Sequence, residues 1–174
     1  ELYKDKISEP STNKLVRGLN FVILPLFSTR NLINIEVGTS SGINAWNAKP
    51  RTSQERRPYG EMYIPIPREI HKLFPIFFPK KDQSFNLEIP TGEVFSAKVC
   101  QQNSKALMTN PNSALEKWLL RDILQLREGE LCTIEKLNRL DIDSVIICKD
   151  SNNYFKIDIM KTGSYLEFIN GIVP

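Results

Sequence analysis

Apolar and polar residues alternate at several places along the chain, as they do in half-buried β-strands. Residues 33–37 carry isoleucine or valine at every second position, with polar residues between them. The same period of two occurs in residues 62–66, 85–89 and 94–99, and the last two of these flank a Pro-Thr-Gly turn that predicts a hairpin. Further short strands are predicted at residues 21–27, 131–134, 144–148 and 154–159.

Two other segments carry helical signals. Pro67 suits the first turn of a short helix over residues 68–74, which Pro75 ends. Ser113 and Glu116 have the spacing of a capping box. An amphipathic helix is then predicted by apolar residues at helical spacing: Leu115, Trp118, Leu119, Ile123 and Leu126. Seven or eight short strands with two helices favour an antiparallel barrel or sandwich.

Between these elements lie two stretches without any apolar period, residues 39–60 and residues 101–112. A long structureless loop in a compact domain is usually functional or disordered. The net charge of the chain is only +3, but its positive charge is concentrated in these two places. From residue 98 to residue 113 there are two lysines and no acid. From residue 42 to residue 60 the acid Glu55 stands against four bases: Lys49, Arg51, Arg56 and Arg57.

The side chains in both stretches suit contacts with DNA. Arg and Lys pair with guanine, Asn and Gln pair with adenine, and Ser and Thr bind phosphates. The candidates in the first stretch are Asn44, Trp46, Lys49, Arg51, Ser53, Gln54, Arg56, Arg57 and Tyr59, of which Trp46 and Tyr59 are expected to brace the loop. The candidates in the second are Lys98, Gln101, Gln102, Asn103, Ser104, Lys105 and Thr109. Composition alone is equally consistent with two solvated polar loops.

Catalytic motifs are scarce. His71 is the only histidine, which excludes an HExxH zinc site and paired HxK nuclease motifs within this chain. We expect a structural or solvent-facing role for it, and no motif for a cofactor or a metal is present. Cys100, Cys132 and Cys148 are odd in number and widely spaced, so they are expected to be reduced core residues of an intracellular protein. The longest apolar run is too short for a membrane span.

Two alternatives to duplex DNA binding stay open on these grounds. One is a self-contained metal-dependent nuclease, with acids such as Glu93 and Asp158 as ligands. The other is a β module that binds a protein, single-stranded DNA or RNA. Because the chain begins with Glu1 and not Met, we expect a fragment or a processed product.

Three stretches together resemble a known family: residues 41–44, residues 57–67 with their Tyr-Ile-Pro segment, and residues 105–113 with their Lys-Ala-Leu-Met segment. The helix around Trp118 and the Asp-Ser-Val at residues 143–145 add to the likeness. They look like the C-terminal B3-like domain of restriction endonucleases of the NgoFVII and NgoAVII group, whose nuclease domain is of the phospholipase-D type. The order of elements is more distantly similar to the plant B3 domain of transcription factors.

The resemblance implies a mainly β fold, a seven-stranded open pseudobarrel with two short flanking helices. It implies that two arms enter the major groove of double-stranded DNA: an N-arm at residues 41–59 and a C-arm at residues 101–109. On this reading residues 1–30 are a linker or extension and residues 31–174 are the domain. The domain would be a non-catalytic monomer, joined in its parent chain to a nuclease domain, in the bacterial cytoplasm. A transcription-factor-like B3 domain is the alternative within the same fold.

Overall fold

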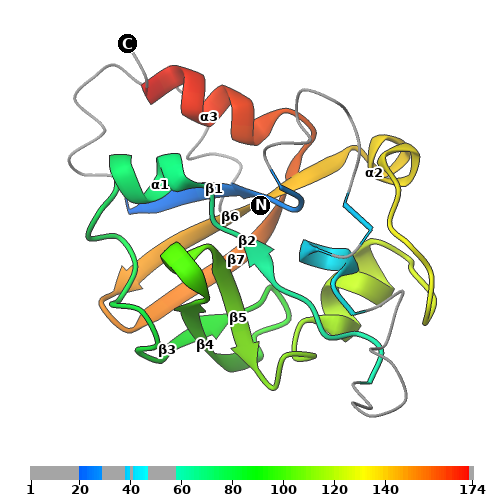
Figure 1. Cartoon of the computed structure of the whole chain (residues 1–174), viewed down its shortest axis with the longest axis horizontal. Coiled ribbons are helices and arrows are strands. Elements are labelled where there is room, and N and C mark those ends of the chain that lie inside the picture. The colour runs from blue at the N-terminus through cyan, green and yellow to red at the C-terminus, as the bar shows by residue number, and fades with distance from the viewer. Residues whose placement is uncertain (1–19, 29–37, 40, 47–57, 173–174) are drawn as a thin grey trace.

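The computed structural model describes residues 20–28, 38–39, 41–46 and 58–172. The strands within these residues form a single seven-stranded sheet. The sheet order is β1-β6-β7-β3-β4-β5-β2, and every neighbouring pair is antiparallel except β3 and β7. The edge strands β1 and β2 contact each other, so the sheet curls into a half-barrel (Figure 1). The strands are β1 (Phe21–Pro25), β2 (Ile64–Pro65), β3 (Phe85–Glu88), β4 (Val94–Cys100), β5 (Ala106–Asn110), β6 (Ile142–Ser151) and β7 (Tyr154–Lys161).

Most of the predicted strands are present, and the predicted pseudobarrel is confirmed. The strand predicted at residues 33–37 lies outside the described residues. The strand predicted at residues 131–134 is wrong, because Ile134 begins helix α2 (Ile134–Leu140) and the Thr133 side chain caps it by accepting the N–H of Lys136. β1 lies within the predicted 1–30 extension, so at least Phe21–Pro25 belongs to the folded sheet.

The helices differ more from the prediction. Helix α1 (Arg68–Leu73) lies where it was expected, whereas the predicted amphipathic helix is a π-helical segment, η5 (Glu116–Ile123). The predicted capping box does not form, since Leu115 is the N-cap without a side-chain hydrogen bond and Glu116 pairs instead with Arg121. Helix α3 (Ser164–Ile172) was not predicted, nor were the 3-10 turns η3 (Gly42–Asn44) and η4 (Gln102–Ser104).

The sheet and the helices share one apolar core. Helix α1 is fixed to this core by Ile70, which is fully buried, and by Phe74, whose ring stacks on Phe168 of α3 with 5.7 Å between centroids. The three cysteines are buried, as predicted. Burial raises the pKa of the Cys132 thiol to about 12, so this side chain stays neutral at physiological pH.

Candidate nucleic-acid interface

Both predicted arms connect to strands near the same edge of the half-barrel. β2 pairs with β5, so that Ile64 lies opposite Leu107 and Pro65 opposite Ala106. The C-arm leaves from β4 and returns along β5, and the N-arm returns through Tyr59 and Gly60 into β2. The returning ends of the two arms therefore lie on neighbouring strands (Figure 1).

We call the two ends of the N-arm its roots. The first root is held in place by the buried side chain of Asn44. The Asn44 amide nitrogen donates to the carbonyl oxygens of Gly38 and Cys132, each at 3.0 Å, and its amide oxygen accepts the N–H of Cys132 at 2.8 Å. Gly42, with a φ of +59°, closes the turn before it, and a Cβ there would lie 3.0 Å from the carbonyl oxygen of Leu26. These bonds hold the start of the arm against the segment that precedes α2.

The second root of the N-arm is packed against η5. Gly60 has a φ of +95°, and a Cβ at this position would lie 2.1 to 2.4 Å from the carboxylate of Glu116. That carboxylate is held by Arg121, whose Nε donates to it at 3.2 Å. On the other side, the rings of Trp46 and Tyr63 meet edge to face at 6.2 Å, so an aromatic contact joins the two roots.

The C-arm begins with a turn of unusual backbone geometry. Gln101, Asn103 and Ser104 all have positive φ, at 69°, 59° and 53°. Left-handed conformations of residues other than glycine persist only where the surroundings hold them. Here the Ser104 N–H donates to the carbonyl oxygen of Gln101 at 3.1 Å, and the Ile66 N–H donates to that of Lys105 at 2.8 Å. The turn is therefore tied both to itself and to the end of β2.

About half of the irregular stretch predicted at residues 101–112 forms a β-strand. β5 begins at Ala106, so only Gln101–Lys105 projects as a turn, while Ala106, Leu107 and Thr109 are buried in the sheet. The sequence pattern of this strand was weak because the strand is short and polar residues, Lys105 and Asn110, stand at its two ends. The C-arm is consequently shorter and more rigid than the sequence suggested.

A family model for the NgoFVII C-terminal B3-like DNA-binding domain matches residues 14–149. The chain belongs to this family. The matched residues of this B3-like domain include both arms and every root contact described above. The resemblance seen in the sequence is thereby confirmed. A search of curated proteins found no match.

Not all predicted contact residues of the B3-like domain lie at its surface. Asn44 is 1% exposed and Thr109 is 5% exposed, with its hydroxyl donating to the carbonyl oxygen of Pro111 at 2.8 Å. Both side chains make hydrogen bonds inside the domain, whereas contacts with DNA were predicted for them. Nothing in the sequence indicated this for Asn44, because two of its three hydrogen bonds are made with Cys132, 88 residues away.

The remaining candidates fall into three groups. Tyr59, Lys98, Gln102, Asn103 and Lys105 are exposed, and Lys98 lies 3.7 Å from the Asp82 carboxylate. Trp46, Gln101 and Ser104 are half-buried, and the Gln101 amide contacts the sulfur of Met108 at 3.7 Å. Outside the described residues lie Lys49, Arg51, Ser53, Gln54, Arg56 and Arg57.

The acids considered for a nuclease do not form a metal centre in the described part of the B3-like domain. There, no group of three His, Cys, Asp or Glu side chains could hold a metal ion. Glu93 accepts from the Thr91 hydroxyl in the β3–β4 turn, and Asp158 accepts the N–H of Ile159 on β7. Among the described helices, none has both the length and the apolar character needed to cross a membrane.

Proposed function

We propose that this B3-like domain recognises a specific site in double-stranded DNA with its two arms in the major groove. The observation that carries the proposal is the common root of the arms on the paired strands β2 and β5, within residues that match a DNA-binding family. Two polar segments that end on paired strands can read adjacent base pairs, because the major groove displays a distinct pattern of donors and acceptors at each pair.

Within the C-arm, Gln102 and Asn103 are the proposed base-reading residues, since both are exposed and carry amides that can pair with adenine. Lys105 is proposed to contact guanine or a phosphate. Within the N-arm, the proposal rests on the local positive charge of Arg51, Arg56 and Arg57. Trp46 is proposed to brace the arm, which the contact of its ring with Tyr63 supports.

In the parent protein, we propose that the domain is the target-recognition part of a restriction endonuclease and that cutting is done by a separate nuclease domain. A monomeric isolated domain and a bacterial cytoplasmic location are parts of the same proposal. The connector of the parent would end before β1, since Phe21–Pro25 is already a strand of the sheet.

Selection of bound sites from a random duplex pool tests the recognition directly. We expect enrichment of one short motif, a clear preference for duplex over single-stranded competitor, and an affinity that falls as salt rises. Recovery of unenriched sequences, or stronger binding to single strands, would contradict the proposal. Incubation of the domain with plasmid and Mg²⁺ tests its non-catalytic nature, and cutting by the isolated chain would refute that part.

A triple substitution tests the N-arm. Changing Arg51, Arg56 and Arg57 to Ala should weaken binding to the selected motif by about 1–3 kcal/mol for each residue that contacts a base. The matched control changes Lys117, Arg139 and Lys161 to Ala, three exposed bases outside the arms. Equal affinities of the two triple variants would show that the N-arm is assigned wrongly.

A further inference from the structure

Helix α1 presents its basic residues on one side. Arg68, His71 and Lys72 stand at positions i, i+3 and i+4, which share a face of a helix. The acid of the same helix, Glu69, faces another way. Glu69 follows Arg68 directly, so it points about 100° away from Arg68 round the helix axis. The face that carries Arg68 and Lys72 is thus separated from the negative charge of its own helix.

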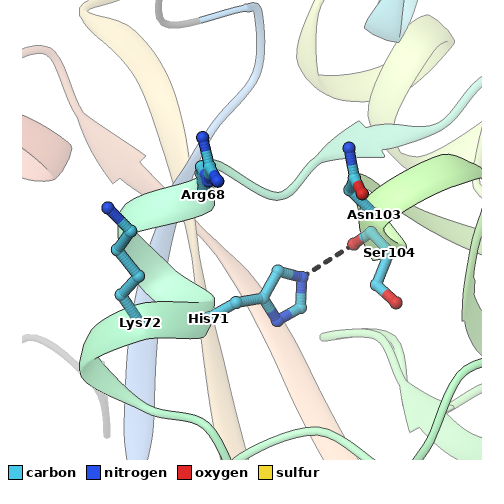
Figure 2. A pocket seen from close by; sticks show the side chains of 5 residues that line it. All are labelled: Arg68, His71, Lys72, Asn103 and Ser104. Atoms are coloured by element: carbon cyan, nitrogen blue, oxygen red, sulfur yellow. Dashed lines mark hydrogen bonds between the residues drawn. The ribbon is translucent and has the colours of Figure 1, made fainter.

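This basic face lies opposite the C-arm. Arg68, His71 and Lys72 line one side of an open hollow of about 480 Å³, and Asn103 and Ser104 of the C-arm line the other (Figure 2). None of the five lining residues is acidic. Arg68, Lys72 and Asn103 are exposed, so their donors are available to a ligand. The hollow offers two positive charges, an amide and a hydroxyl, which is a donor set suited to a phosphate group.

His71 fixes the distance between the two sides. Its Nε2 lies 2.7 Å from the carbonyl oxygen of Ser104, and because a carbonyl oxygen can only accept, Nε2 carries the proton and donates (Figure 2). The bond holds one of the left-handed residues of the C-arm turn directly to α1. The two sides of the hollow are therefore held at a fixed distance, because a hydrogen bond between residues 33 positions apart joins them.

We propose that this hollow binds a backbone phosphate of the DNA that the C-arm reads, with Arg68 and Lys72 as the phosphate ligands and His71 as the positioning residue. The inference rests on the proposed function and adds α1 to the two arms as a third contact. A phosphate held beside the C-arm would set the register of Gln102 and Asn103 on the bases. It carries no sequence information itself, because every nucleotide has the same phosphate.

The test compares two pairs of single variants of the whole chain, titrated with a selected duplex and with a scrambled duplex over a range of salt. Arg68→Ala and Lys72→Ala should each weaken binding to both duplexes about tenfold. Each should also make the negative slope of log affinity against log salt shallower by about 1. Arg139→Ala and Lys161→Ala remove the same charge from exposed positions on α2 and at the end of β7, and should change neither quantity.

The outcomes separate the two proposals. Wild-type protein that binds no duplex at all refutes the proposed function. Wild-type protein that binds its motif, with Arg68→Ala and Lys72→Ala indistinguishable from their controls, refutes the phosphate site alone. Loss of affinity for the selected duplex only, with an unchanged salt slope, would mean that these residues read bases and would also overturn the phosphate assignment.

His71 gives a second readout, because it is the only histidine of the chain and its ring signals are unambiguous in an NMR spectrum. Addition of duplex DNA should shift these signals in the wild type and leave them nearly unchanged in the Arg68→Ala/Lys72→Ala double variant. Inorganic phosphate should produce the same shift only at millimolar concentration. Saturation by inorganic phosphate at micromolar concentration would identify a small-anion site instead and contradict the DNA assignment.

Discussion

The substitution Asn44→Ala tests whether the root of the N-arm is built as described. It removes an amide that makes three hydrogen bonds at a position that is 1% exposed. The N–H of Cys132 would remain buried without its acceptor, which costs about 1–3 kcal/mol, and two carbonyl oxygens would each lose a bond worth about 0.5–1.5 kcal/mol. The free energy of unfolding should fall by about 3 kcal/mol.

Urea unfolding followed by fluorescence or circular dichroism measures this loss, and the slope of the transition should not change because the same surface is exposed. For a chain of this size the melting temperature should fall by about 6–12 °C. Asn138→Ala, at an exposed position on α2, is the control and should change stability by less than about 0.5 kcal/mol. An Asn44→Ala variant of full stability that has lost DNA affinity would show that Asn44 contacts DNA and does not brace the arm.

Three further measurements follow from the same geometry. Gly60→Ala should destabilise the protein by at least about 1 kcal/mol more than Gly92→Ala in thermal melts, because both glycines have a φ near +90° but only Gly60 faces a carboxylate; equal losses would refute the steric argument. Because the pKa values of Cys132 and Tyr165 are raised in the folded state, the unfolded chain releases these protons at a lower pH than the folded chain does. Their contribution to the free energy of unfolding is therefore fully present below about pH 9 and is lost as the pH rises further. A urea midpoint that is flat from pH 8 to 11 would contradict this. Gln102→Ala should relax specificity at one base pair by about 1–3 kcal/mol in a binding assay over single-base variants, and a uniform loss over all variants would assign Gln102 to the backbone.

How far the sequence predicts the fold depends on whether an element stabilises itself locally. β3 and β4 alternate apolar and polar residues around a tight turn, so their hairpin is visible in the sequence. The stripe of Tyr165, Phe168, Ile169 and Ile172 is also present in the sequence and would have indicated α3. The strand predicted at 131–134 failed because a short run with β-branched residues also fits a cap and a first helical turn, and the Thr133 side chain decides between them.

The same distinction between local and distant interactions applies to the candidate site. Positive charge and amide side chains locate the two arms, and the family match covers both. What the sequence cannot indicate is which polar residues face inward, because that depends on partners far away in the chain. Asn44 bonds residue 132, and His71 bonds residue 104. The sequence therefore indicated the turn at residues 101–105 but not the hydrogen bonds that hold it, and most of the first stretch lies outside the described residues.

The shortness of β2 has a consequence for the protein in solution. An exposed strand edge is a template on which another chain can add a strand, and long flat edges promote aggregation. In the described part of the chain one edge of the sheet is only Ile64–Pro65, proline offers no N–H to an incoming strand, and β1 at the opposite edge lies against it. The curvature that brings the two edges together thus also leaves little backbone on which misassembled copies could grow into fibrils.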